Sequence, residues 1–273
     1  MIDSPNLGGN AFYLACHATL LIPEIWLGIR HKTWGFLFGM FCGHVLEFIG
    51  YSARVYMHDR GDGFLMNIVT LTIGPAFFSA SIYLCLARII SVYGQHLSRF
   101  QPRVYTITFM LFDFFALILQ ASGGSILGSD DPAKLDTGLA IMKAGLIVHL
   151  VAITVFIGLA CEFAWTVVHK RGQWNPNFEH LQNSHKFQRF LIGLSIATLC
   201  ILIRTSFRVA ELSNGLNSKL ANDEVALMIL EGAMVLIATV CLAIWHPGVA
   251  FQGRWKEANF RMRGEKEYEL TDA

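Results

Sequence analysis

The stretch "WGFLFGMFCGHVLEFIGYSARVYM", from Trp34 to Met57, decides the class of fold. About 20 consecutive apolar residues cross a bilayer as an α-helix, and this run is long enough to do so. Two of its residues, Glu47 and Arg54, are charged. A charged side chain at the centre of a bilayer costs about 2.5–3.5 kcal/mol on insertion scales. We therefore expect both side chains to face the interior of a helix bundle rather than lipid.

The rest of the chain repeats this apolar pattern. Of its 273 residues, 54% are hydrophobic and 15% are charged, whereas about a quarter of a soluble domain is charged. Apolar runs of membrane-crossing length occupy roughly residues 11–29, 34–57, 64–92, 104–128, 137–168, 190–212 and 225–246. The sequence therefore predicts an all-α polytopic membrane protein. We expect one seven-helix transmembrane domain over residues 1–250 and a short charged tail over residues 251–273.

Lysines and arginines between the runs predict the orientation of the bundle. One side would hold Arg60, Lys134 and Lys219. The other side would hold Arg30, Lys32, Arg99, Arg103, Lys170, Arg171, Lys186, Arg189, Arg254, Lys256, Arg261, Arg263 and Lys266. Cytoplasmic loops of membrane proteins carry an excess of Lys and Arg. We therefore expect the N-terminus outside the cell and the C-terminal tail in the cytosol.

The second run carries its polar residues on one face. Gly39, Gly43, Glu47, Gly50 and Arg54 recur at steps of three or four residues, which places them on one helical stripe. Glycines on such a stripe allow a neighbouring helix to approach closely. Glu47 and Arg54 are two turns apart, about 10.5 Å along the axis. Each is therefore expected to pair with a group on another helix.

Other runs supply candidate partners for this stripe. Together with Glu47 and Arg54, the predicted polar interior consists of Asp113, Gln120, His149, Arg204, Arg208, Glu211 and Glu231. Counting along each run puts most of these residues in the outer half of the membrane, with Glu47, Asp113 and His149 nearer its middle. We therefore predict a polar interior that opens toward the outer side.

Each of these residues also has a purely structural interpretation. Buried ion pairs can fix the register of helices, and residues near the end of a span, such as Arg204, can snorkel to the interface. A lone histidine such as His149 is more often a hydrogen-bonded interior residue than a ligand. Glu24 lies near the expected cytoplasmic interface, where we expect it to face water or a lysine.

Four stretches resemble one known family when they are read in order. The second run contains "EFIGYSAR", similar to an E-x-x-G-Y-x-x-R element, and the third contains "PAFFSASIYLCLARII". The fourth reads "DFFALILQASGG", the sixth reads "IRTSFRVAELSNG", and the last run ends at "HPG". These elements are similar to those of the fungal lipid-translocating exporter (RTA-like) family. The resemblance covers about Asn10 to Gly248 and implies a seven-helix membrane protein associated with lipid translocation and resistance to lipophilic compounds.

The chain departs from this family at two predicted interior positions. Glu231 stands where relatives usually have Asp, and the aromatic residues near it are replaced by Ala226, Leu227 and Met228. His149 stands where Gln is expected. Both changes alter the predicted interior and can alter the choice of ligand.

The leading functional hypothesis is a translocator or exporter of lipids or lipophilic toxic compounds in the plasma membrane. Its polar interior would bind the headgroup of an amphiphile: carboxylates such as Glu47 could hold an amine, and arginines such as Arg54 could hold a phosphate. The alternative is a seven-helix receptor or sensor for a lipophilic ligand. Protein partners stay open.

Other function classes lack their motifs. No GxxxxGK[ST] phosphate-binding loop is present, and the six cysteines include no CxxC pair. The histidines of the predicted spans fall on separate runs, which disfavours a haem protein or intramembrane enzyme. We therefore expect no enzymatic activity, no cofactor, no metal site and no nucleic-acid partner.

Overall fold

The structure is a computed structural model that describes residues 6–60, 63–128, 132–213 and 224–258. Seven of its helical segments are long and apolar enough to cross a membrane, which confirms the predicted all-α seven-helix bundle. The first six are α1 (Leu7–His31), α2 (Trp34–Arg60), α3 (Phe64–Tyr93), α4 (Pro102–Leu127), α5 (Pro132–His169) and α7 (His185–Ser213). The last crossing combines α9 (Glu224–Leu227), a π-helical segment η4 (Met228–Ala233) and α10 (Met234–Ile244).

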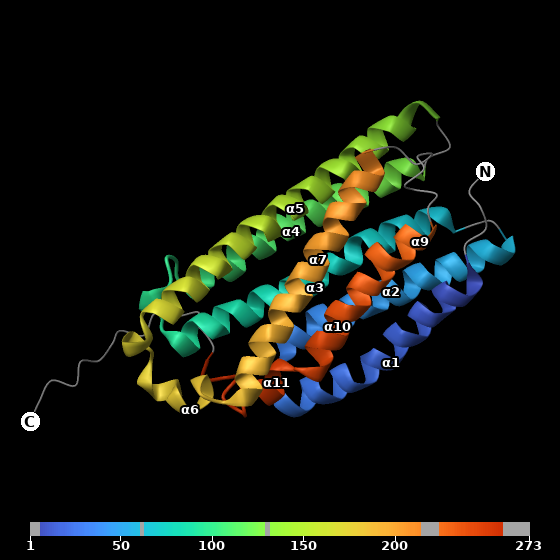
Figure 1. Cartoon of the computed structure of the whole chain (residues 1–273). Coiled ribbons are helices and arrows are strands. Elements are labelled where there is room, and N and C mark those ends of the chain that lie inside the picture. Colours follow the sequence, from blue (N-terminus) through green and yellow to red (C-terminus); the bar gives the residue numbers. More distant parts are fainter. Residues whose placement is uncertain (1–5, 61–62, 129–131, 214–223, 259–273) are drawn as a thin grey trace, which may run out of the picture.

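Short helices lie at one end of the bundle. They are η1 (Gln95–Leu97), η2 (Arg171–Gln173), η3 (Pro176–Phe178), α6 (Glu179–Gln182) and α11 (Pro247–Ala250). Because the number of crossings is odd, the start of α1 and the segment α11 lie at opposite ends, as Figure 1 shows. We refer to these as the α9 end and the α11 end. The side of the membrane that each end faces stays a prediction.

Helix α3 occupies the centre of the bundle. It packs against α2 on one side and against α4 on the other, while α1 pairs with α2 and α5 pairs with α4. Within its most apolar window, 67% of α3 is buried, against 22% for α1. Figure 1 shows the pairs α1–α2 and α4–α5 on either side of α3, with α7 crossing over it and α10 beside α7 on the side of α1. A helix enclosed in this way reads as apolar all round.

The glycine stripe of α2 faces α3. A Cβ added at Gly39 would collide with Ser81, and one added at Gly43 would collide with the ring of Phe78. Both neighbours belong to α3, so the absence of side chains at these glycines brings the two helices together. This close approach was expected from the spacing of the glycines.

The packed chain continues beyond residue 250. Trp255 is only 3% exposed, and its ring lies under the guanidinium group of Arg88 at 3.8 Å. Arg88 also donates a hydrogen bond of 2.6 Å from Nη1 to the carbonyl of Trp255. Residues 251–258 of the expected tail therefore pack against α3 at the α11 end, and residues 259–273 lie outside the described residues.

Candidate functional site

An ion-pair cluster of five side chains lies inside the α9 half of the bundle. Glu231 is its centre: its Oε1 lies 2.6 Å from Arg208 Nη2 and 3.1 Å from Arg204 Nη2, and its Oε2 lies 3.7 Å from Arg54 Nη1. Arg208 also binds Glu211, with 2.8 Å between Nη1 and Oε2. The cluster therefore consists of Arg54 from α2, Arg204, Arg208 and Glu211 from α7, and Glu231 from η4. Arg54 pairs with a group on another helix, as expected from the sequence, whereas Glu47 forms no ion pair within the described residues, so the same expectation is wrong for Glu47.

The cluster is enclosed by protein. Arg204 and Glu231 are each 1% exposed, and Arg54, the most open member, is 9% exposed. Arg204 additionally donates a hydrogen bond to the carbonyl of Leu71 on α3. Removing one partner from a buried ion pair costs about 3–5 kcal/mol, because the other charge is left uncompensated. The cluster therefore connects α2, α3, α7 and η4 through buried groups whose charges and hydrogen bonds compensate one another.

The backbone around Glu231 is irregular. Residues Met228–Ala233 form a π-helix. This conformation is rare in proteins, and where it does occur it often lies at a functional site. Helix α1 packs against this segment, and the hydroxyl of Tyr13 donates a 2.8 Å hydrogen bond to the carbonyl of Met228. A Cβ added at Gly232 would meet the ring of Tyr13 and the hydroxyl of Tyr51. The segment that carries Glu231 is therefore held between α1, α2 and α7.

Glu47 lies beside the ion-pair cluster without joining it. Its side chain is 0% exposed, and it lies in the field of Arg204, Arg208 and Glu231. Its neighbour on α3 is Gly74, where an added Cβ would come within 2.8 Å of Glu47 Oε1. Neither carboxylate oxygen accepts a hydrogen bond from any residue that the structure describes. Glu47 is thus a buried carboxylate next to a site without a side chain.

Three of the predicted site residues lie elsewhere, between α4 and α5. His149 Nδ1 and Asp113 Oδ1 are 2.8 Å apart, and both side chains are buried. Gln120 lies two turns further along the same face of α4 and packs against Gly145 of α5. Within the described ranges, no ion pair connects these residues to the cluster around Glu231. The structure therefore places the nine predicted residues in two groups.

Sequence reasoning missed two further polar pairs. His17 of α1 and His44 of α2 are both 0% exposed, and their Nδ1 atoms are 3.0 Å apart. Glu24 was expected to face water or a lysine, and this expectation is wrong. It is 0% exposed, and its Oε2 lies 3.8 Å from Nε2 of His246 at the start of α11. The seven-residue spacing from His17 to Glu24 was the available signal, because it places both on one face of α1.

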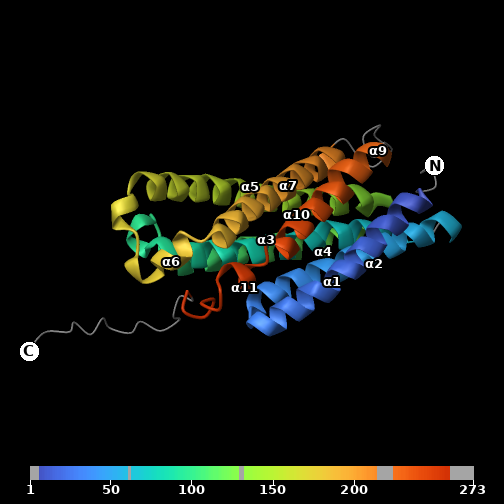
Figure 2. The same ribbon diagram turned by 60° about the horizontal axis from the view of Figure 1, so that its bottom comes forward.

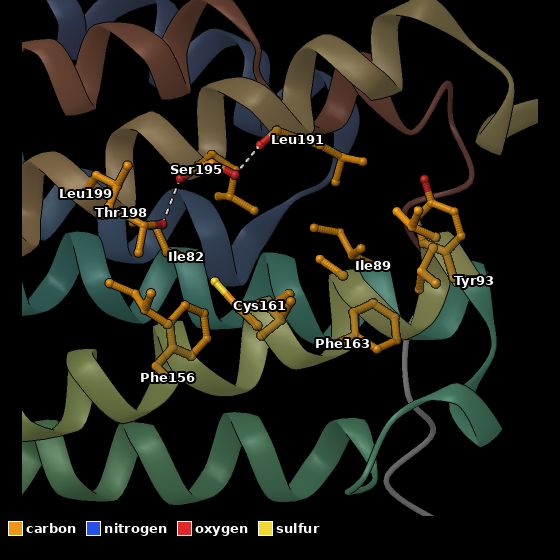
Figure 3. Close-up of a pocket in the computed structure, with 17 residues that line it drawn as sticks. Ile82, Ile89, Tyr93, Phe156, Cys161, Phe163, Leu191, Ser195, Thr198 and Leu199 are labelled. Carbon is orange, nitrogen blue, oxygen red and sulfur yellow. Dashed lines mark hydrogen bonds between the residues drawn. The ribbon is translucent and has the colours of Figure 1, made fainter. Parts of the chain in front are cut away.

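A separate apolar groove lies between α3, α5 and α7 in the α11 half. It has a volume of about 360 Å³, and no charged side chain is among its described lining residues. Figure 3 shows Phe156 and Cys161 of α5 facing Ile82 and Ile89 of α3 across it. The hydroxyls of Ser195 and Thr198 donate to the carbonyls of Leu191 and Leu194 within α7. The groove therefore offers apolar contacts of the kind an alkyl chain makes.

Titratable and thiol side chains do not gather into a metal site in the part of the chain that is described. No group of three or more His, Cys, Asp or Glu residues there has the proximity that a metal ion requires. The described residues instead provide a buried ion-pair cluster, the carboxylate of Glu47 beside it, and several buried histidines.

Comparison with known proteins gives consistent matches along the chain. Residues 40–254 match the family described as RTA1 like protein. The sphingoid long-chain base transporter RSB1 of Saccharomyces cerevisiae is 30% identical over 92% of this chain and 74% of its own length. Protein RTM1 of the same yeast is 24% identical over 82% of this chain and 73% of its own length. Its protoporphyrin uptake protein 1 is 26% identical over 75% of this chain and 66% of its own length. No solved structure matches the chain.

The family match includes every helix that contributes to the ion-pair cluster, and it confirms the resemblance inferred from the motifs. The chain is an integral multi-pass membrane protein, and it belongs to the RTA1-like family.

Proposed function

We propose that this protein moves amphiphilic lipids across its membrane and that Glu47 binds the headgroup. The relative RSB1 is named as a transporter of sphingoid long-chain bases. A long-chain base carries an amine, which is a cation near neutral pH. The observation that carries the proposal is the buried carboxylate of Glu47, whose oxygens accept no hydrogen bond from the described chain. An ammonium group supplies both the charge and the donors that such a carboxylate needs.

The ion-pair cluster favours an amine over a phosphate. An anionic headgroup would have to bind arginines, but Arg204 and Arg208 already contact Glu231, and Arg208 also contacts Glu211. Separating these pairs would leave buried charges uncompensated. Glu47 has no such partner to give up. We therefore propose that the cluster holds α2, α7 and η4 in place around the site, while Glu47 makes the direct contact with substrate.

The substrate's alkyl chain would stay in an apolar environment during transport. The groove between α3, α5 and α7 is lined by side chains such as Phe156 and Leu194 and lies toward the α11 end. It offers a protein surface along which a tail can lie while its headgroup crosses the interior. Any lipophilic toxic compound that combines a cationic group with an apolar body would fit the same description.

Cellular placement follows from the sequence pattern. We infer that the protein resides in the plasma membrane, with the α9 end facing outside and the α11 end facing the cytosol. Relatives with functional names are named for transport or uptake, and we propose transport without enzymatic catalysis. A seven-helix receptor would bind the same amine but would not accelerate its movement between leaflets.

Headgroup selection can be tested by ligand-dependent melting of the purified protein. We would compare a long-chain amine, the alcohol and the carboxylic acid of equal chain length, with wild type and Glu47→Gln. A ligand at 100 times its Kd stabilises the folded state by about 2.7 kcal/mol, which corresponds to about 5–11 °C for a domain of this size. The amine should give this shift with wild type only. Equal shifts for amine and alcohol, or an unchanged amine shift in Glu47→Gln, would refute the assignment.

A further inference from the structure

The inward face of α1 is polar along its whole length. Its buried residues are Asn10, Tyr13, His17, Glu24 and Gly28, and none of them is aliphatic. From Asn10 to Glu24 the polar residues of this stripe span about 21 Å at 1.5 Å per residue, or about two thirds of a bilayer's hydrocarbon core. Helix α2 packs directly against α1. Ionisable side chains therefore line the inward face of α1 over about 17 Å, from Tyr13 to Glu24.

Six residues make up this α1–α2 seam: His17, Glu24, His44, Glu47, Tyr51 and His246. From the α9 end, Glu47 and Tyr51 come first, one turn apart on α2. Tyr51 stacks on the ring of His17 with 5.9 Å between ring centres, and His17 contacts His44. Glu24 and His246 follow toward the α11 end, where Figure 2 shows α11 beside the turn between α1 and α2. All six side chains are buried.

The tautomer of His246 can be read from its hydrogen bonds. The backbone N–H of Gly248 donates to its Nδ1 over 3.0 Å. A nitrogen that accepts a hydrogen bond carries no proton, so in the neutral ring the proton sits on Nε2. That nitrogen is the atom nearest Glu24 Oε2, at 3.8 Å. The protonated nitrogen of His246 therefore faces Glu24, at a distance longer than a direct hydrogen bond.

The proton positions of the His17–His44 pair follow from the same reasoning. Because the two Nδ1 atoms are 3.0 Å apart, one of them donates and the other accepts when both rings are neutral. The donor ring then has a bare Nε2, and the acceptor ring carries its proton on Nε2. Neither Nε2 has a hydrogen-bond partner among the residues that are described. The pair thus presents one proton acceptor and one proton donor, the two ends that a relay requires.

A purely structural role does not explain these groups. An unsatisfied buried polar atom costs about 1–3 kcal/mol, and well-packed apolar residues would hold two helices together without that cost. Both oxygens of Glu24 accept no hydrogen bond from the described chain. Polar residues that are expensive inside a membrane and face the bundle interior commonly mark ion pathways or proton relays.

The geometry points to a proton pathway along the α1–α2 seam, linking Glu47 at the proposed headgroup site to His246 at the α11 end. A carboxylate of the seam takes up one proton and releases one. A histidine accepts a proton on one ring nitrogen and releases the proton of the other. No bond between heavy atoms forms or breaks. The pathway is inferred from the buried groups of the seam alone, whereas its coupling to lipid movement rests on the proposed function.

A break in the seam separates its two halves. His17 and Glu24 are seven residues apart on α1, about 10.5 Å along the axis, so their pairs cannot hydrogen-bond directly. A proton crosses this gap only when water from either compartment enters it. Water must also bridge the step from Glu47 to the histidine pair and the step from Glu24 to His246, because neither is a hydrogen bond among the described residues. Helix α1 is the least enclosed crossing, and its movement away from α2 would admit that water. A gated break of this kind allows coupled transport without a continuous leak.

The charged and titratable groups around the seam define what else affects it. Glu47 lies near Arg204, Arg208 and Glu231, and Tyr51 lies near Arg54 and stacks on Tyr13. His31 approaches His246 with 6.3 Å between ring centres. On α3, Cys85 lies near Glu24, and Arg88 lies near Cys85. Substitutions in the seam itself are the cleanest test, because the surrounding groups also support the ion-pair cluster and the C-terminal packing.

The test is proton flux into liposomes that contain the full-length protein. A trapped pH-sensitive dye reports flux driven by an imposed membrane potential, with and without a long-chain amine. A fluorescent long-chain amine reports exchange between leaflets in the same vesicles without any gradient. We would compare wild type with His17→Gln, Glu24→Gln, the exposed control His180→Gln and protein-free vesicles.

With the long-chain amine present, we expect wild type and His180→Gln to conduct protons well above protein-free vesicles that contain the same amine. His17→Gln and Glu24→Gln should conduct at least about tenfold less while retaining gradient-free lipid exchange, a combination that misfolding would not give. Lipid exchange by wild type without proton flux overturns the pathway and leaves the proposed function standing. Proton flux without lipid exchange overturns the proposed function and leaves the pathway standing. Proton flux that is equal in wild type and both seam variants also overturns the pathway. Where a variant does not fold, the comparison of wild type with protein-free vesicles decides the outcome.

Discussion

Glu231→Gln removes the one carboxylate that contacts three arginines. Gln has nearly the same shape but lacks the charge, so Arg204 and Arg208 lose contacts of 3.1 and 2.6 Å to a carboxylate. Arg208 keeps Glu211, and Arg204 keeps the carbonyl of Leu71. Arg54 keeps no other carboxylate within 4.0 Å among the described residues. The substitution therefore leaves buried positive charge without compensation.

The expected loss follows from burial. Breaking a buried ion pair costs about 3–5 kcal/mol, and each kcal/mol lowers Tm by about 2–4 °C for a domain of this size. Glu231→Gln should therefore lower Tm by about 6–20 °C. The chain provides a matched control in Glu162, whose Oε1 lies 3.0 Å from Arg99 Nη2 with side chains 43% and 62% exposed. An exposed pair contributes about 0–1 kcal/mol, so Glu162→Gln should change Tm by no more than about 4 °C.

The assay is thermal unfolding of both variants in the same detergent, with the yield of monodisperse protein as a second readout. Adding Arg204→Gln to Glu231→Gln should recover part of the loss, because it removes one of the uncompensated charges. If Glu231→Gln and Glu162→Gln melt within about 2 °C of each other, the cluster does not contribute as a buried ion-pair network, and this reasoning is wrong.

Three further predictions follow from single contacts. Gly74→Ala would place a Cβ within 2.8 Å of Glu47 Oε1 and should weaken amine binding at least about tenfold in the ligand-dependent melting assay. The control Gly158→Ala, with no atom within 4 Å of the added Cβ, should bind as wild type does. Trp255→Ala removes the ring under Arg88 and should destabilise by about 3–5 kcal/mol; unchanged thermal unfolding would show that residues beyond 250 do not support the bundle. An epitope tag after Ala273 should be inaccessible to protease on intact cells, and cleavage from outside would reverse the predicted orientation.

The number of spans could be predicted because length and apolarity determine membrane crossing directly. The seven runs are separated by polar segments, and each is long enough to cross a bilayer as a helix. The α2 glycine stripe was also predictable, because three- and four-residue steps define a helical face whatever packs against it. The spacing did not show which helix that face contacts. Gly43 could have approached any neighbouring helix, and the structure places Phe78 of α3 against it.

Pairings between helices could not be derived in the same way. Counting along the runs gave the depth of each charge to within several residues, but it gave no rotation and no neighbour for its helix. The sequence therefore did not determine a partner for Arg204, and in the structure that partner is Glu231. Asp113 appeared to belong to the same interior as Glu47, yet it pairs with His149 between α4 and α5.

Glu24 shows a different limit. Its position near the expected cytoplasmic interface suggested contact with water, because that inference considered only distance from the end of α1. In the structure, Glu24 is buried, and its Oε2 lies 3.8 Å from Nε2 of His246, which precedes α11. A residue that follows the last span cannot be assigned to the first by any pattern within either segment.

The central claim, lipid movement through a site at Glu47, is tested most directly by leaflet exchange in reconstituted liposomes. The measurement is the initial rate at which a fluorescent long-chain amine moves between leaflets with wild type, with Glu47→Gln of equal yield and Tm, and without protein. We predict that wild type accelerates exchange at least about tenfold over protein-free vesicles and that folded Glu47→Gln falls back to near the protein-free rate. Exchange by folded Glu47→Gln at the wild-type rate, or no acceleration by wild type, would contradict the account.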